Sequence, residues 1–347
     1  MPRSALTFFL LTLSAAAHAG AGTDPHLDPT LLPLGCVSCH RGHGVARSSM
    51  LPAAQAHVCL ACHDTQARLD SEIRQGRVSV LARPTLLAAT LTQPYRHPLS
   101  TAAFSSREPG AITCTSCHSP HRGLRLERPR GDSSVPRLSP RDPSQLEHEL
   151  CESCHGNLGA ATLNVSDLAR LLEPSNRSYH PVHGPAVERS PSLKPSWSGR
   201  ELSCGDCHGP SDPGAPAGPH GSAVEYVLTD SYATVDGGLE TATTYALCYR
   251  CHDRESVLDR SPFATHRLHV VDVRASCATC HNPHGALVNR ALIRFGEESR
   301  LTGVAPSARS GRLEFTSSGP GSGSCTLSCH GRDHEGETYG VSLLPAF

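Results

Sequence analysis

The sequence has little of what builds an ordinary hydrophobic core. Phenylalanine, tyrosine and tryptophan together make up only 4% of its 347 residues, whereas it contains 30 glycines and 28 prolines. A chain of this composition buries too little apolar surface to offset the conformational entropy that folding removes. Its interior therefore needs something other than amino-acid side chains to fill it.

Other absences exclude classes of function. The sequence has no phosphate-binding loop, no H-E-x-x-H zinc motif and no G-x-S-x-G nucleophile elbow. No catalytic residue is predicted from carboxylates or serines, and the protein is not expected to be an enzyme. The formal net charge of −1 argues against nucleic acid as a partner. Beyond the N-terminal segment no apolar stretch approaches the length of a membrane span, so no transmembrane segment is predicted.

The N-terminal segment predicts export. An apolar run over residues 5–17 follows Arg3, and a small-x-small cleavage site ends at Ala19. This arrangement is typical of a secretory signal peptide over residues 1–19, and the run is too short for a membrane anchor. We expect the mature protein in the periplasm, or secreted or associated with the outer membrane.

What the sequence has in excess is one short motif. All 16 cysteines fall in eight copies of Cys-x-x-Cys-His, and the last copy has one extra residue between its cysteines. The cysteines are Cys36, Cys39, Cys59, Cys62, Cys114, Cys117, Cys151, Cys154, Cys204, Cys207, Cys248, Cys251, Cys277, Cys280, Cys325 and Cys329. The motif histidines are His40, His63, His118, His155, His208, His252, His281 and His330.

This motif is typical of c-type haem attachment. Two thiols one helical turn apart can add to both vinyl groups of one porphyrin edge, and the histidine on the same face then points at the iron. In the last copy, cysteines at i and i+4 still share a face. Zinc ribbons and C-x-x-C redox sites are the alternatives, but neither requires a histidine after the second cysteine. We predict eight covalent haem c groups, which supply the missing core.

The predicted fold is mostly irregular, with short α-helices organised around stacked covalent haems and little β-structure. Only residues 312–316 alternate like a strand. The motifs form four pairs, which divide the chain into units over residues 20–90, 91–175, 176–258 and 259–347. A Gly/Pro-His-Gly/Arg step follows the first motif of each pair, and a short helix introduces most of the second motifs. The histidines of these steps are His43, His121, His220 and His284.

This pattern resembles the doubled C-x-x-C-H family of multihaem c-type cytochromes, over roughly residues 26 to 335. The resemblance lies in C-x-x-C-H-x-P-H followed by L-C-x-x-C-H. It implies covalent haem c, irons with two histidine ligands and a role in extracytoplasmic, anaerobic respiratory electron transfer. The insertion before His220 and the stretched motif at Cys325 depart from the family pattern.

The supply of histidine decides between electron transfer and catalysis, because an iron with two protein ligands cannot bind substrate. Of the 22 histidines, eight belong to the motifs and one lies in the expected signal peptide, which leaves thirteen. Met50 is the only methionine after the initiator, so His/His ligation at every iron is the economical interpretation, and it implies low potentials. The distal candidates are His26, His43, His97, His121, His180, His220, His266 and His284, with His183, His269 and His334 as competitors. His57 and His148 are interpreted as exposed helix residues.

The leading hypothesis is an exported octahaem electron carrier. Its expected partners are redox proteins: a quinol oxidase system upstream, and a reductase or an outer-membrane conduit downstream. Self-association through exposed haems is a further expectation. The alternative is an octahaem reductase of nitrite, hydroxylamine or a sulfur oxyanion with one open haem. All eight motifs keep their histidine, which favours the carrier.

Overall fold

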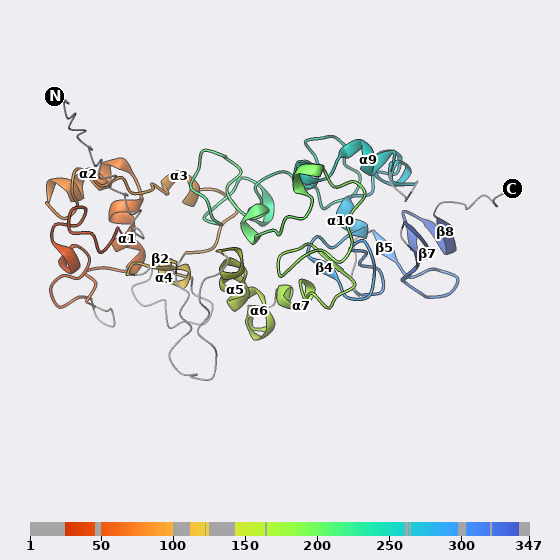
Figure 1. Ribbon diagram of the computed structural model, residues 1–347, viewed down its shortest axis with the longest axis horizontal. Coiled ribbons are helices and arrows are strands. Elements are labelled where there is room, and N and C mark those ends of the chain that lie inside the picture. Colours follow the sequence, from red (N-terminus) through yellow and green to blue (C-terminus); the bar gives the residue numbers. More distant parts are fainter. Residues whose placement is uncertain are drawn as a thin grey trace, which may run out of the picture.

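The structure is a computed structural model that describes most of the chain. The described residues are 25–45, 50–99, 112–121, 123–124, 143–163, 165–260, 263, 265–297, 303–319 and 321–339. The expected signal peptide, residues 1–19, lies outside them. The molecule is elongated, with the first helices at one end and a β-sheet at the other (Figure 1).

Short helices and loops make up most of the molecule, as predicted. The α-helices are α1 (Gln55–His63), α2 (Gln66–Arg74), α3 (Ala88–Leu91), α4 (Cys114–Cys117), α5 (Pro143–His155), α6 (Asn157–Leu163), α7 (Leu168–Leu171), α8 (Ala246–Cys251), α9 (Arg254–Leu258) and α10 (Cys277–Cys280). Single turns of other helix types occur at Gly35–Ser38, Pro195–Trp197, Cys204–Asp206, Glu225–Val227 and Leu268–Asp272. Helices α1, α5 and α8 end in the second motif of their units, which confirms the expected helical approach to those motifs.

The β-structure is concentrated at the C-terminal end. Strands β5 (Val304–Ala305) and β6 (Glu314–Gly319) pair with successive parts of one edge of β7 (Ser322–Cys329), and β8 (Arg332–Tyr339) pairs with its other edge. All pairings are antiparallel. Elsewhere the two-residue strands β1 (His118–Ser119) and β2 (Gly123–Leu124) pair, as do β3 (Ser178–Tyr179) and β4 (Gly285–Ala286). The sheet is larger than the predicted strand at 312–316, and it contains the last motif.

Buried side chains form only small clusters among the described residues. One cluster, between residues 245 and 270, joins Tyr245, Tyr249, Leu258 and Val270. A second, near the N-terminus, is formed by Leu69, Val78 and Ala82. Clusters of this size do not add up to the core of a domain. The expectation that side chains alone leave the interior unfilled is therefore consistent with the packing.

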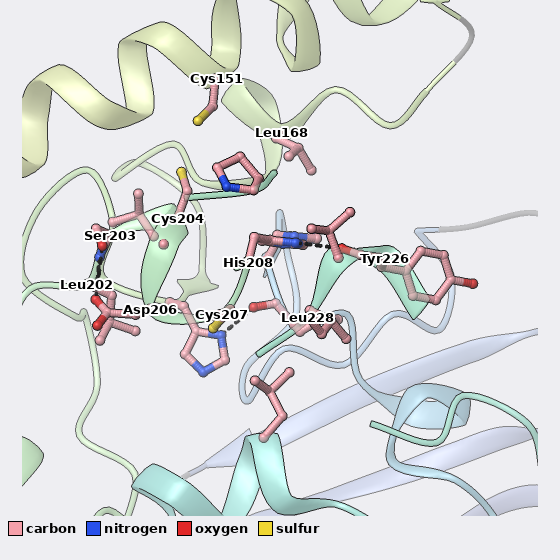
Figure 2. A pocket seen from close by; sticks show the side chains of 18 of the residues that line it. Cys151, Leu168, Leu202, Ser203, Cys204, Asp206, Cys207, His208, Tyr226 and Leu228 are labelled. Carbon is pink, nitrogen blue, oxygen red and sulfur yellow. Dashed lines mark hydrogen bonds between the residues drawn. The ribbon is translucent and has the colours of Figure 1, made fainter. Parts of the chain in front are cut away.

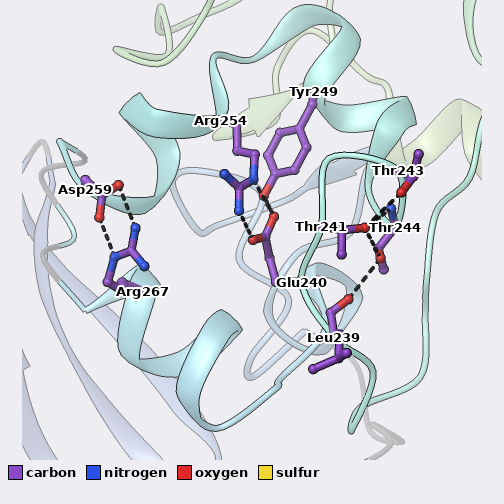
Figure 3. A network of polar contacts seen from close by, with 9 residues as sticks. All are labelled: Leu239, Glu240, Thr241, Thr243, Thr244, Tyr249, Arg254, Asp259 and Arg267. Carbon is purple, nitrogen blue, oxygen red and sulfur yellow. Dashed lines mark hydrogen bonds and ion pairs between the residues drawn. The ribbon is translucent and has the colours of Figure 1, made fainter.

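A buried carboxylate anchors the larger cluster. The Glu240 side chain is 1% exposed, and it accepts hydrogen bonds from Arg254 Nε at 2.8 Å and from the Tyr249 hydroxyl at 3.0 Å (Figure 3). Burial raises the pKa of Glu240, but these two donors outweigh burial and hold the pKa below its ordinary value. A neighbouring ion pair between Asp259 and Arg267 flanks the same helix, α9. The loop before α8 is thereby tied to α9.

Replacing this carboxylate tests its contribution to stability. Because the folded pKa of Glu240 is depressed, its stabilisation is present above the unfolded pKa of about 4.3 and is lost as pH falls through the folded pKa. Glu240→Gln should cost about 1–3 kcal/mol at pH 7, and the cost should shrink at acid pH. Thermal unfolding followed by circular dichroism across pH measures this, with the exposed Glu255→Gln as control. A cost that does not change with pH would contradict it.

Candidate functional site

One continuous cavity runs through the described parts of the chain. Its volume is about 4720 Å³, and all 16 cysteines and all eight motif histidines line it. Protein interiors are packed as densely as organic crystals, so a cavity of this size needs a large occupant. Nine further histidines line the same cavity: His26, His97, His121, His180, His220, His266, His269, His284 and His334.

The first seven motifs all lie on helical turns, which are 3-10 turns in the first and fifth motifs and α-helical in the others. Their cysteines lie on a helical turn, and in the turns at Cys204, Cys248 and Cys277 the motif histidine N–H donates to the carbonyl of the first cysteine at 2.8 to 2.9 Å. This turn brings two thiols and one imidazole to the cavity together. Figure 2 shows the fifth motif, where Cys204, Cys207 and His208 surround one such opening.

Consecutive motifs lie next to one another in sequence order. At each boundary between pairs, the first cysteines of two motifs lie close enough for each thiol to shift the pKa of the other; these neighbours are Cys59–Cys114, Cys151–Cys204 and Cys248–Cys277. Within pairs, cysteines of neighbouring motifs also act on one another, since the charges of Cys325 and Cys329 raise the pKa of Cys280. The eight motifs therefore form a single row in which each site borders the next.

Seven motif histidines each face one imidazole from elsewhere in the chain. The ring centroids are separated by 6.2 Å for His40–His121, 5.9 Å for His63–His26, 5.8 Å for His118–His220, 6.2 Å for His155–His97, 6.3 Å for His208–His284, 6.4 Å for His252–His180 and 6.3 Å for His281–His266. A metal lies about 2 Å from each imidazole nitrogen that binds it, which puts the centroids of two such rings roughly 6 Å apart. The seven pairs fit an iron between them.

The hydrogen bonds of these imidazoles leave the same nitrogen for a metal. Nδ1 lies 2.9 Å from the Tyr226 carbonyl in His208 and 2.7 Å from the Ala291 carbonyl in His281. In His252 the Nδ1 partner is the Ser192 hydroxyl, at 2.9 Å. A partner on Nδ1 fixes the ring and leaves Nε2 for ligation.

Burial keeps several paired imidazoles neutral, as ligands must be. It lowers the pKa of His252 and of His284 to about 4. It lowers the pKa of His266 to about 3. At neutral pH these rings carry a lone pair rather than a charge, which suits a metal ligand.

The pairs interlock the sequence units. The first motif histidine of units one, two and three faces the Pro-His step of the following unit, in the pairs His40–His121, His118–His220 and His208–His284. The second motif histidine faces the opening of its own unit. The opening histidines of units two and three also contact the Pro-His step of the following unit. His97 Nδ1 lies 3.1 Å from the Pro219 carbonyl, and His180 Nδ1 contacts the Pro283 carbonyl. Each of these sites needs residues from two units.

His220 and His284 are each followed by a glycine, because the backbone of another unit packs closely against that glycine. A Cβ at Gly285 would lie 1.9 Å from the Leu171 carbonyl oxygen. At Gly221 it would lie 2.1 Å from the Thr90 carbonyl oxygen. The backbone can approach this closely only where there is no side chain. These contacts set the position of His284 and His220.

A methyl group added at Gly285 should push the Pro283-His284 step away from the Leu171 carbonyl. Gly285→Ala should destabilise the protein by about 1–3 kcal/mol, because the Leu171 carbonyl cannot move without its helix. Thermal unfolding measures the loss. Gly184→Ala is the matched control, since a Cβ there has nothing within 4 Å. Equal melting temperatures for the two variants would show that the close approach is not needed.

The remaining histidines fall outside these seven pairs. His43 lies in an exposed turn and does not line the cavity, and His57 is exposed on α1. His183 contacts the Glu152 carboxylate through Nε2, and that hydrogen bond raises the pKa of His183. Its ring lies 4.5 Å from the ring of His148, which is half-buried rather than exposed as predicted.

The last motif differs from the others in its surroundings. His330 faces a carboxylate, with its Nε2 3.4 Å from Asp236 Oδ2. His269 and His334 face each other, with ring centroids 6.5 Å apart. The motif lies on β7 rather than on a helical turn.

Comparison with known families supports the chemistry of the motifs. The doubled CXXCH motif family matches the chain over residues 34–68 and 198–257. This match supports a multihaem c-type cytochrome, and the motifs indicate covalent haem c. No curated protein and no solved structure matches the chain significantly. In the described part of the chain, no helix combines the length and apolar character that a membrane crossing requires.

Proposed function

We propose that the protein is an exported octahaem c-type cytochrome that carries electrons along a row of haems, each with two histidine ligands. The observation that supports this most strongly is the set of seven facing imidazole pairs at 5.8 to 6.4 Å. Haem c supplies one-electron chemistry, and an iron held on both sides by protein has no position for a substrate. Electron transfer is the function that remains.

The chain sets the properties of each site through its own residues. Neutral imidazoles on both sides favour low potentials, because methionine is the ligand that raises them. Where Nδ1 has a hydrogen-bond partner, as His208 has in the Tyr226 carbonyl, the ring is held in one orientation, so little rearranges when the charge of the iron changes.

The row also suggests where partners bind. The first pair of motifs lies at one end of the elongated molecule and the last at the other (Figure 1). We propose that electrons enter at one end from a quinol oxidase system and leave at the other to a reductase or an outer-membrane conduit. The same ends would allow self-association through exposed haems.

Cofactor load is the first test. The mature protein should begin near Gly20 and carry eight covalent haems after expression with a full maturation system. Intact mass spectrometry measures both. A Cys36→Ser/Cys39→Ser double variant should lose the mass of one haem, which calibrates the count. Fewer than seven haems in the unaltered protein would contradict the proposal.

Ligand removal is the second test. His284→Ala should leave one of the eight ferric irons high-spin, because His208 would lose the imidazole that faces it. The reduced variant should then bind carbon monoxide at that iron. Electron paramagnetic resonance measures the spin state, with the exposed His57→Ala as control. A high-spin iron already present in the unaltered protein would favour the reductase instead.

A further inference from the structure

The fifth and sixth motifs stand next to one another in the row, but their turns bind side chains of opposite charge. Lys194, the only lysine of the chain, binds the sixth turn at the end of α8. Its Nζ donates a hydrogen bond to the Tyr249 carbonyl at 2.6 Å and lies 3.4 Å from the Arg250 carbonyl. Both carbonyls belong to residues between the two motif cysteines. The ammonium group is therefore held on the turn that would carry the sixth haem.

Backbone hydrogen bonds keep the lysine in this place. The Lys194 N–H donates to the Cys251 carbonyl at 2.9 Å, and the Asp253 N–H donates to the Ser192 carbonyl at 2.7 Å. Residues 192–194 therefore run antiparallel to the end of the sixth motif. The position of the ammonium group does not depend on its own side chain alone.

The charge of Lys194 is not offset as that of its neighbour is. Arg250, in the sixth motif itself, is paired with Asp230, with 3.0 Å between Nη1 and Oδ2. Among the described residues, the hydrogen-bond partners of the Lys194 ammonium group are carbonyls rather than carboxylates. The sixth turn therefore keeps a positive charge from Lys194.

Ser192, in the same segment, gives the sixth motif histidine a different kind of partner. Nδ1 of His252 lies 2.9 Å from the Ser192 hydroxyl, whereas Nδ1 of His208 and of His281 lies against a backbone carbonyl. An amide carbonyl is the stronger hydrogen-bond acceptor, because resonance places electron density on its oxygen. A stronger acceptor on Nδ1 makes an imidazole a more basic ligand. His252 is therefore a less basic ligand than His208, the motif histidine of the fifth site.

The fifth motif turn binds carboxylates instead of a cation. Gly205 lies between the two cysteines of this motif, and its N–H donates to Glu147 Oε1 at 2.6 Å. Asp206 belongs to the turn itself, and its Oδ2 accepts the Ser203 N–H at 2.7 Å. Two acidic side chains are thus fixed on the fifth turn, where the sixth turn has Lys194.

Charges fixed beside an iron shift its reduction potential. Reduction removes one positive charge from the iron, so a nearby cation favours the reduced form and a nearby carboxylate favours the oxidised form. A less basic imidazole stabilises the oxidised iron less, which also raises the potential. At the sixth site Lys194 and Ser192 therefore act in the same direction. At the fifth site Glu147 and Asp206 act in the opposite direction.

We propose that the sixth site has a higher reduction potential than the fifth, and that Lys194, Ser192 and Glu147 set the difference. This inference rests on the proposed function, because it takes a haem at both sites. It gives transfer between these two neighbours a direction. An electron that reaches the third unit would settle on the sixth site rather than on the fifth.

Ligand variants assign the two sites in a spectroelectrochemical titration. His180→Met changes a ligand of the sixth site and His284→Met changes one of the fifth, and methionine ligation raises the potential of the site that carries it. In the unaltered protein, the step that His180→Met shifts most should lie at a higher potential than the step that His284→Met shifts most. The opposite order, or equal potentials, would overturn the inference.

Charge variants test the residues that set the difference. Lys194→Gln should lower the sixth-site potential, because the charge is lost while an amide can still donate to the same carbonyls, and Lys194→Arg should restore it. Glu147→Gln should raise the fifth-site potential. Arg200→Gln is the matched control: it removes an exposed cation of the same loop, which stacks on Trp197 at 4.3 Å from the ring centroid. Equal shifts in Lys194→Gln and Arg200→Gln, or no shift in Lys194→Gln, would overturn the inference.

A neutral variant tests the hydrogen bond separately from charge. Ser192→Asn offers Nδ1 of His252 an amide carbonyl, so it should lower the sixth-site potential without changing the net charge. An unchanged or raised potential would overturn the role of Ser192. Where Ser192→Asn or Lys194→Gln fails to load its haems, the other variant decides.

Cofactor load separates this inference from the proposed function. A row of at least seven haems with only low-spin ferric iron, in which the fifth site lies at or above the sixth, would overturn the inference alone and leave an electron carrier. Fewer than seven haems in the unaltered protein would overturn both.

Discussion

The fold depends on imidazole rings from distant parts of the chain meeting across a shared space. His40 faces His121 and His118 faces His220, and both pairs span a unit boundary. A metal bound by both rings would close a long loop. A chain with few buried side chains gains too little free energy from packing to offset the entropic cost of closing that loop. The side-chain clusters around Tyr249 and Leu69 are local supports. We propose that haems filling the cavity hold the row of sites together.

Interlocking also explains how the row stays continuous. The step histidines His121, His220 and His284 each face a motif histidine of the preceding unit. For the last two of them, the proline carbonyl before the histidine also contacts the opening histidine of that preceding unit. The Pro219 carbonyl and His220 show this double use, and the glycine that follows lets the Thr90 backbone approach. A unit cut out of the chain would lose a facing imidazole and a hydrogen-bond acceptor together. In the proposed function, the contacts that hold the structure together are therefore also the contacts that keep the electron-transfer row continuous.

Local chemistry was predictable from the sequence, and long-range pairing was not. The thiols and motif histidines follow from a five-residue pattern, and seven predicted distal candidates line the cavity, from His26 to His284. Which ring faces which depends on loops of variable length, so spacing could not assign the pairs. His43 fits the same step pattern as His121 but lies in an exposed turn. The Gly/Pro-His step in the sequence therefore does not predict whether its histidine is buried or which imidazole it faces.

The C-terminal sheet shows a second limit of sequence patterns. Residues 314–316 alternate and form part of β6, as predicted. Residues 317–324 are rich in glycine and serine and have the composition of a loop, yet residues 317–319 belong to β6 and residues 322–324 belong to β7. Pairing with two neighbours overrides their low strand propensity. From its pattern, the last motif was expected on a helical turn like the others. This expectation is wrong, because pairing with β6 and β8 holds β7 extended.

Anomalous diffraction at the iron edge, from crystals of the holoprotein, tests the central claim most directly. It locates each iron without reference to the chain. The account predicts irons between His40 and His121, between His118 and His220, and between His208 and His284, with neighbouring irons following sequence order. Irons bound only by histidines of a single unit, such as one between His40 and His43, would contradict it.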